Sequence, residues 1–157
     1  MPQPRLEFSF RIEIQVSKPI VVSNDKELGK RQLIPIESGV VSGALSGKVL
    51  PGGIDSQIID KDGLCRLSAR YAIETDQGQT FYIENNGIRR IPQEWREQLF
   101  SDDMSFFNQL APEEIYFKTT PNFEVYSSEL KWLTESVFIC SAQRSATGVL
   151  LDMYQVQ

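Results

Sequence analysis

The sequence predicts an all-β protein, with one antiparallel sheet that is closed or nearly closed into a barrel. Three observations support this fold class. Residues 6–16 alternate between apolar and polar side chains, which is the period of a strand with one buried face. Strand-like stretches then recur between turns rich in Asp, Gly and Pro. Only 92–100 has a helical pattern, and many short strands with little helix are typical of sandwiches and barrels. Closure is favoured because it leaves no unpaired edge.

The elements are expected in the following order along a single domain that spans 1–157. The first strand places Leu6, Phe8, Phe10, Ile12, Ile14 and Val16 on its buried face. A polar loop follows, and a strand from Leu45 enters the turn Pro51-Gly52-Gly53. A short helix is expected at 92–100 because Pro92 suits a first helical turn and Trp95 and Leu99 are four residues apart. The remaining strands are expected at 32–41, 54–59, 64–75, 80–86, 115–120, 137–142 and 149–156.

Composition narrows the possible partners. The 157 residues carry a net charge of −5, which argues against a nucleic-acid partner because phosphate binding needs a basic surface. No apolar stretch approaches the roughly 20 residues of a membrane span, and the N-terminus lacks the apolar centre of a signal peptide. Cys65 and Cys140 are expected to be buried free thiols. We therefore expect a cytoplasmic protein that binds neither nucleic acid nor membranes. A homo-oligomer is left open.

The sequence contains no histidine. This removes the usual general base near neutral pH and the commonest metal ligand. Two isolated cysteines do not supply a zinc site, so no metal and no cofactor are expected. Any catalysis would have to use Asp, Glu, Tyr, Lys, Cys or Arg side chains.

Several motifs along the chain resemble one family. The stretch from Leu45 to Gln57 contains Pro51-Gly52-Gly53-x-Asp55, and Tyr116-Phe117-Lys118-Thr119-Thr120-Pro121 follows later. Together with the C-terminal Asp152-Met153-Tyr154, these motifs are similar to the family of small β-barrels known as domain of unknown function family 3237. The resemblance implies a barrel like that of allene oxide cyclases and, more loosely, of lipocalins, with no established general activity. Ser56 stands where that family usually has Trp.

Counting residues around the hairpin turns suggests which side chains share a face. If 60–63 and 76–79 are the turns, Tyr71 lies opposite Glu84 on the apolar face, which also carries Tyr82. In this first hypothesis Tyr71, Tyr82 and Glu84 point into the barrel, and burial makes Glu84 an acid or base. The alternative is that Glu84 is solvated and the tyrosines only pack.

A second hypothesis places the site at the mouth of the barrel. The same count puts Asp55 and Arg70 on one face, where they would form a charge pair beside the Pro-Gly-Gly turn, or simply a solvated ion pair. Lys118 could offer a cation to an anionic ligand. An error of one residue in either turn would exchange the two faces.

These observations favour a small-molecule-binding barrel. As an enzyme, it would be a cofactor-free isomerase, cyclase or lyase acting on a hydrophobic or aromatic metabolite, with Asp55 or Glu84 moving the proton and Tyr71 or Tyr82 donating a hydrogen bond. Arg70 and Lys118 would complete the ligand contacts. The alternatives are a non-catalytic carrier barrel and a structural or oligomerisation module whose lumen is packed with side chains.

Overall fold

The computed structural model describes residues 1–157 and contains ten antiparallel strands in one closed sheet. Around the barrel the order is β1-β10-β9-β8-β7-β6-β5-β3, and β3 pairs with β1 to close the ring. Two additional strands, β2 and β4, pair with β3. The predicted all-β barrel is thus confirmed. The bounds are β1 Leu6–Val16, β2 Ile20–Asp25, β3 Gly29–Gly43, β4 Gly47–Val49, β5 Gly53–Ile59, β6 Cys65–Thr75, β7 Thr80–Arg90, β8 Tyr116–Val125, β9 Phe138–Arg144 and β10 Gly148–Val156.

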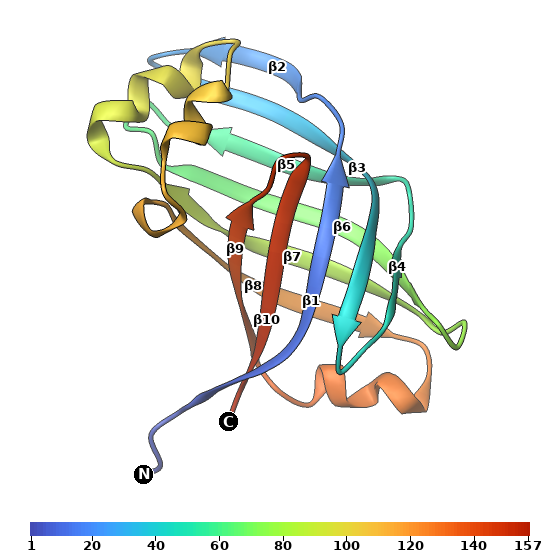
Figure 1. Ribbon diagram of the computed structural model, residues 1–157. Coiled ribbons are helices and arrows are strands. Elements are labelled where there is room, and N and C mark those ends of the chain that lie inside the picture. Colours follow the sequence, from blue (N-terminus) through green and yellow to red (C-terminus); the bar gives the residue numbers. More distant parts are fainter.

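Four 3-10 segments cover the two ends of the barrel. Between β7 and β8 lie η1 (Gln93–Phe100), η2 (Ser105–Gln109) and η3 (Pro112–Glu114), and between β8 and β9 lies η4 (Ser128–Thr134). Figure 1 shows the first three gathered at one end and η4 at the opposite end. The helix expected at 92–100 is present, as η1. No helix of the protein has the length and apolar character needed to cross a membrane.

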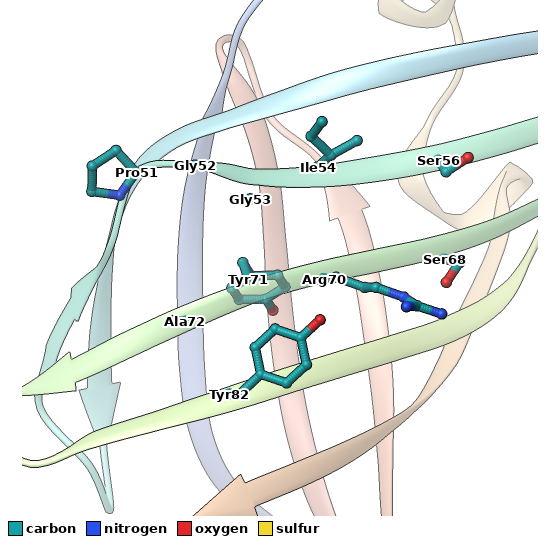
Figure 2. Close-up of a pocket in the computed structure, with 10 residues that line it drawn as sticks. All are labelled: Pro51, Gly52, Gly53, Ile54, Ser56, Ser68, Arg70, Tyr71, Ala72 and Tyr82. Atoms are coloured by element: carbon teal, nitrogen blue, oxygen red, sulfur yellow. The ribbon is translucent and has the colours of Figure 1, made fainter.

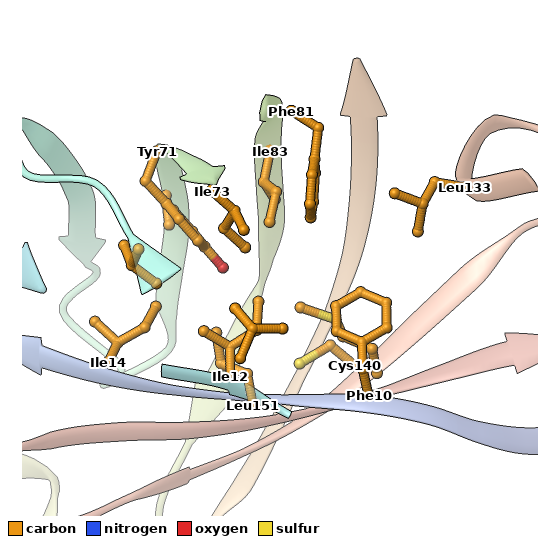
Figure 3. Packing of buried hydrophobic residues seen from close by; sticks show 14 of the residues in the cluster. Phe10, Ile12, Ile14, Tyr71, Ile73, Phe81, Ile83, Leu133, Cys140 and Leu151 are labelled. Carbon is orange, nitrogen blue, oxygen red and sulfur yellow. The ribbon is translucent and has the colours of Figure 1, made fainter. Parts of the chain in front are cut away.

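Two hydrophobic clusters fill the interior. The larger has 17 buried residues and lies on the η4 side, where Leu130 and Leu133 join Phe10, Phe138 and their neighbours (Figure 3). The smaller has nine buried residues, among them Leu99, Phe106, Phe107 and Leu110 from the segments between β7 and β8. The end segments therefore complete the core of the barrel.

The alternation in the first strand is confirmed only for its second half. Phe10, Ile12 and Ile14 are almost fully buried, whereas Leu6 and Phe8 are about half exposed. The pairing with β10 shifts between Phe8 and Phe10, and a bulge of this kind turns the earlier side chains out of the core. The polar loop expected after the first strand also contains a strand, β2, whose residues are all exposed.

Candidate functional site

The hairpin between β5 and β6 decides where Asp55 points. The structure pairs Ile59 with Cys65 and Asp55 with Ala69, one residue away from the predicted register. Gly63 has a φ of +86° and its N–H donates to the carbonyl of Asp60. A turn that ends on a left-handed glycine adds an unpaired residue to the loop. The predicted face of β5 was therefore wrong, and Asp55 lies on the inner face.

The hairpin between β6 and β7 also ends on a left-handed glycine and also differs by one residue from the predicted register. Gly78 has a φ of +85°, and the register pairs Arg70 with Glu84 and Ala72 with Tyr82. Tyr82 and Glu84 therefore lie on the outer wall, and the prediction that they share the interior with Tyr71 was wrong. Arg70 forms an exposed ion pair with Glu84 at 3.9 Å, so the predicted pair of Arg70 with Asp55 is absent.

The Pro-Gly-Gly-x-Asp motif brings β5 close to β6. A Cβ on Gly53 would lie 2.5 Å from Cβ of Tyr71 and 2.8 Å from the carbonyl oxygen of Arg70, and Gly52 has a φ of +105°. A side chain at Gly53 would displace the neighbouring strand, and the left-handed backbone at Gly52 favours glycine although the space around it is open. Asp55 follows two residues after Gly53 on the same strand, and both Asp55 and Tyr71 line the same interior cavity.

Four polar side chains converge on that cavity, which has a volume of about 40 Å³. Asp55 on β5 and Asn85 on β7 stand in one row across the sheet, with the small side chain of Ala69 between them. Tyr71 is the next inward residue on β6 (Figure 3). The remaining polar residue is Thr119 on β8, and the rest of the lining is apolar.

Each of these four residues has a buried oxygen without a hydrogen-bond partner in the protein. The atoms are Oδ1 of Asp55, the hydroxyl of Tyr71, Oδ1 of Asn85 and Oγ1 of Thr119. One unsatisfied buried polar group costs about 1–3 kcal/mol, so native structures contain few of them. Four around one cavity are typical of a site that receives a polar group of a ligand or a water molecule.

The other carboxylate oxygen of Asp55 is held in place. Nε2 of Gln57 donates to Oδ2 of Asp55 at 2.8 Å, and Oε1 of Gln57 accepts from Nε2 of Gln32 at 2.8 Å. Burial raises the pKa of Asp55, while the hydrogen bond from Gln57 and the charge of Arg89 act in the opposite direction. The result is an oriented carboxylate that holds a proton at higher pH than an ordinary aspartate.

The neighbouring titratable groups remain protonated. Burial raises the pKa of Tyr71 well above its ordinary value, so its hydroxyl remains a donor. Burial also raises the pKa of Cys140 to about 11 and raises that of Cys65. Because the thiolate is the nucleophilic form, neither cysteine is suited to nucleophilic catalysis at neutral pH. The protein has no cluster of three or more His, Cys, Asp or Glu side chains placed to hold a metal.

A larger hollow, of about 720 Å³, lies on the outer wall of the barrel. Figure 2 shows its lining from the Pro51–Gly53 turn, β5, β6 and β7, with Ser56, Arg70 and Tyr82 among them. Arg70 is already paired with Glu84, and Ser56 accepts a hydrogen bond from Arg31 at 3.0 Å. The unpartnered groups lie on the inside of the barrel, so we place the candidate site there.

Lys118 also lies outside the cavity, where its Nζ donates to Oγ of Ser141 at 2.7 Å. The structure thus brings together only Asp55 and Tyr71 of the six predicted site residues. It adds Asn85 and Thr119, which line the same cavity and are not among those six. Asn85-Asn86-Gly87 looks like a turn, but β7 continues through it. The alternation of β7 could have revealed Asn85, because every second residue from Phe81 onward points inward and this pattern continues to Arg89.

Fold and site together define a closed antiparallel β-barrel that holds a small group of polar side chains in an apolar interior. The chain belongs to the DUF3237 family, described as "Protein of unknown function", whose pattern matches residues 4–156. The resemblance predicted from the Pro-Gly-Gly-x-Asp and Tyr-Phe-Lys-Thr-Thr-Pro motifs is thus confirmed.

Relatives and solved structures agree with this assignment. A UPF0311 protein of Clostridium acetobutylicum is 51% identical over 148 residues, which are 94% of this chain and 90% of the relative. The crystal structure of a protein with unknown function from Clostridium acetobutylicum has a TM-score of 0.91 at 48% identity, covering 100% of this chain and 99% of that one. The crystal structure of an enzyme from Penicillium herquei has a TM-score of 0.74 at 18% identity, with 100% and 98% coverage, and shares the fold.

Proposed function

We propose that the protein is a cofactor-free enzyme that moves a proton within a small hydrophobic or aromatic molecule. The reaction would be an isomerisation, a cyclisation or a related lyase step. The observation that carries the proposal is the set of four unpartnered buried oxygens around one cavity. Asp55 is the acid–base group of the proposed site, and Tyr71 is its hydrogen-bond donor.

Asp55 suits this task because its two oxygens have different surroundings. Oδ2 is held by Gln57, whereas Oδ1 is free. A carboxylate with a raised pKa is a stronger base than an ordinary aspartate, and its protonated form persists closer to neutral pH. In the proposed step, Oδ1 accepts a proton from a substrate carbon or hydroxyl. The same proton then returns at another position of the substrate, so Asp55 ends the cycle unchanged.

Tyr71, Asn85 and Thr119 would orient the reacting group. The neutral hydroxyl of Tyr71 can donate to a substrate oxygen on which negative charge develops. Thr119 offers a second hydroxyl, and the unpartnered Oδ1 of Asn85 can accept a hydrogen bond. The cavity has the volume of a single functional group or a water molecule rather than of a whole metabolite. The rest of a substrate would therefore extend out of the cavity.

Two other functions are favoured by particular observations. The unpartnered oxygens would equally serve a carrier barrel that releases its ligand unchanged. The cluster of 17 buried residues inside the barrel favours a structural module with a filled lumen. The solved structure from Penicillium herquei has the same fold and is described as an enzyme, which supports a catalytic function.

Product analysis separates these functions. The protein and its Asp55→Asn variant are each incubated with a metabolite extract, and the extracts are compared by liquid chromatography and mass spectrometry. The proposal predicts that only the wild type depletes a compound, with an isomer of equal mass appearing, or two fragments whose masses add up to it. A compound that co-purifies unchanged with the protein would instead indicate a carrier.

Tyr71→Phe is expected to lower turnover about a hundredfold, the usual effect of losing one donor to a developing negative charge. The variant should be as stable as the wild type or up to about 1 kcal/mol more stable, because an unpartnered buried hydroxyl is removed. Tyr82→Phe is the matched control, since Tyr82 lies on the outer wall, and should change neither quantity. Equal turnover in both variants would remove Tyr71 from the mechanism. Rates and urea unfolding curves measure the two effects.

The cytoplasmic location remains part of this proposal. Cys65 and Cys140 are both buried and unpaired, and buried free thiols are typical of proteins from reducing compartments. Fractionation of cells that produce the protein from its native promoter would locate it.

A further inference from the structure

Two arginines meet on one aromatic ring at the end of the barrel that η1, η2 and η3 cover. The guanidinium carbon of Arg144 lies 4.2 Å from the ring centre of Phe107, and that of Arg89 lies 5.1 Å from it. Arg89 is also 5.8 Å from the ring centre of Phe117. Arg144 comes from β9, Arg89 from β7 and Phe107 from η2. Segments distant in the sequence thus bring two like charges together.

Neither arginine forms an ion pair, and the acidic charge that acts on Arg89 is that of Asp55 in the neighbouring cavity. The four ion pairs of the structure are Arg11–Asp152, Lys48–Glu74, Arg70–Glu84 and Lys131–Glu135. Arg89 is only 3% exposed, and its Nη2 has no hydrogen-bond partner. An unpaired buried guanidinium is costly. A ring face compensates only in part, since a cation–π contact contributes about 0.5–2 kcal/mol.

The surroundings increase this excess of positive charge. The buried Lys30 donates from Nζ to the carbonyl oxygens of Leu99 and Ser101 at 2.9 and 3.2 Å. Burial lowers the pKa of Lys30, the negative charge of Asp102 raises it, and the like charge of Arg89 lowers it. Partial desolvation and the charge of Arg89 lower the pKa of Arg144 to about 10. Arg144 lies exposed at the end of β9 and is still a cation at neutral pH. This end of the barrel thus gathers three positive charges, of which Lys30 and Arg89 are buried and Arg144 is exposed, although the whole chain carries a net charge of −5. An anion would relieve the repulsion.

Beside the arginines there is space for a ligand. A pocket of about 300 Å³ is lined by Arg144, by the ring of Phe107 and by apolar residues that include Leu110 and Ile115. This volume is at the lower end for small-molecule sites. Arg89 contacts Phe107, which lines this pocket, and Phe117, which lines the cavity of Asp55. Arg89 lines neither space, and its buried charge lies behind these two rings.

We propose that this pocket binds a small apolar or aromatic carboxylate, with its carboxylate on Arg144, its apolar part against Phe107, Leu110 and Ile115, and the buried charge of Arg89 as added electrostatic support. Arginine suits this role because its planar fork of N–H groups matches the two oxygens of a carboxylate. If the proposed function is correct, this carboxylate is the substrate, and that part of the inference rests on the proposed function. The binding site itself rests on the arginines and the pocket.

Benzoate and benzamide test the charge requirement, since they have nearly the same shape and only benzoate is an anion at neutral pH. Binding to the full-length protein is measured by calorimetry or by chemical shifts at constant ionic strength. Wild type should bind benzoate at least about tenfold more tightly than benzamide, as expected for charge-assisted hydrogen bonds. Arg144→Gln should abolish this difference and leave benzamide binding unchanged. Arg66→Gln, which removes the same charge from an exposed outward position, should preserve the difference.

Other outcomes overturn the proposal: equal affinity for the two probes, binding of neither at millimolar concentration, or a preference for benzoate that survives Arg144→Gln. Arg144 is preferred to the buried Arg89 for substitution because its loss endangers folding less. Asp55→Asn separates the two proposals, since it should abolish turnover and retain or strengthen benzoate binding. A variant at Asp55 that keeps full turnover and the benzoate preference would contradict the proposed function while leaving the anion site supported.

Discussion

Asp55→Asn is expected to lower turnover by about a thousandfold, the middle of the range for loss of a general acid–base group. The amide has nearly the shape of the carboxylate and can still accept the hydrogen bond from Gln57. It cannot take up and release a proton at accessible pH. The rate is measured with the compound that the metabolite comparison identifies.

The same variant should be more stable than the wild type at neutral pH, by about 1 kcal/mol, because it removes a charge that burial disfavours. The pKa of Asp55 is raised above the ordinary value of 3.8 in the folded protein. The folded state therefore binds this proton more tightly than the unfolded state, and the wild type loses stability as pH rises from about 3.8 through the folded pKa. The advantage of the variant should be full above that pKa and should vanish near pH 3.8, as urea unfolding across this range would show.

Glu84→Gln is the matched control for Asp55→Asn. It removes the same charge from the outer wall, where Glu84 pairs with Arg70 at 3.9 Å between exposed side chains. Exposed pairs contribute about 0–1 kcal/mol, so stability should change little and turnover should stay within about twofold. Loss of turnover in Glu84→Gln with full activity in Asp55→Asn would exchange the two assignments and move the site to the outer wall.

Gly87→Ala is expected to destabilise the protein by about 3 kcal/mol, which is large for the addition of one methyl group. A Cβ at this position would lie 2.2 Å from the carbonyl oxygen of Lys118 and 2.6 Å from Cα of Thr119. Both are backbone atoms of β8, so no change of rotamer relieves the clash. The strands β7 and β8 would have to separate at Gly87. This position lies between Asn85 and Arg89 on β7 and beside Thr119 on β8.

The neighbouring Asn86→Ala provides the comparison. Asn86 is exposed on the same strand, so its truncation should change stability by less than about 0.5 kcal/mol. Denaturant unfolding of both variants measures the difference. A Gly87→Ala variant as stable as Asn86→Ala would show that β7 and β8 are not in close contact at this point. The benzoate preference should weaken in Gly87→Ala even when the variant folds, because Arg89 follows two residues later.

Most of the strands could be predicted because the alternation of apolar and polar residues that marks a strand lies within the strand itself. The alternation that ends in Phe10, Ile12 and Ile14 predicts one buried face without knowledge of any partner. Glycine and aspartate mark both hairpins around β6 correctly. Register is harder, because a single left-handed glycine adds one residue to a loop, and that residue reverses the faces of the next strand.

The site was only partly predictable for a related reason. Tyr71 lies on a strand whose apolar neighbours reveal its inner face, whereas Asn85 and Arg89 are polar residues on an inner face and interrupt the pattern. Asn85-Asn86-Gly87 also has the composition of a turn. That β7 continues through these residues follows from its pairing with both β6 and β8, which depends on contacts distant in the sequence.

The central claim is that the cavity bounded by Asp55, Tyr71, Asn85 and Thr119 receives a polar ligand group or water. A high-resolution crystal structure of the wild-type protein tests it most directly. The account predicts electron density for a ligand atom or an ordered water within about 2.6–3.2 Å of at least two of the four oxygens. A dry cavity in which these oxygens are hydrogen-bonded to one another or to other protein groups would contradict it.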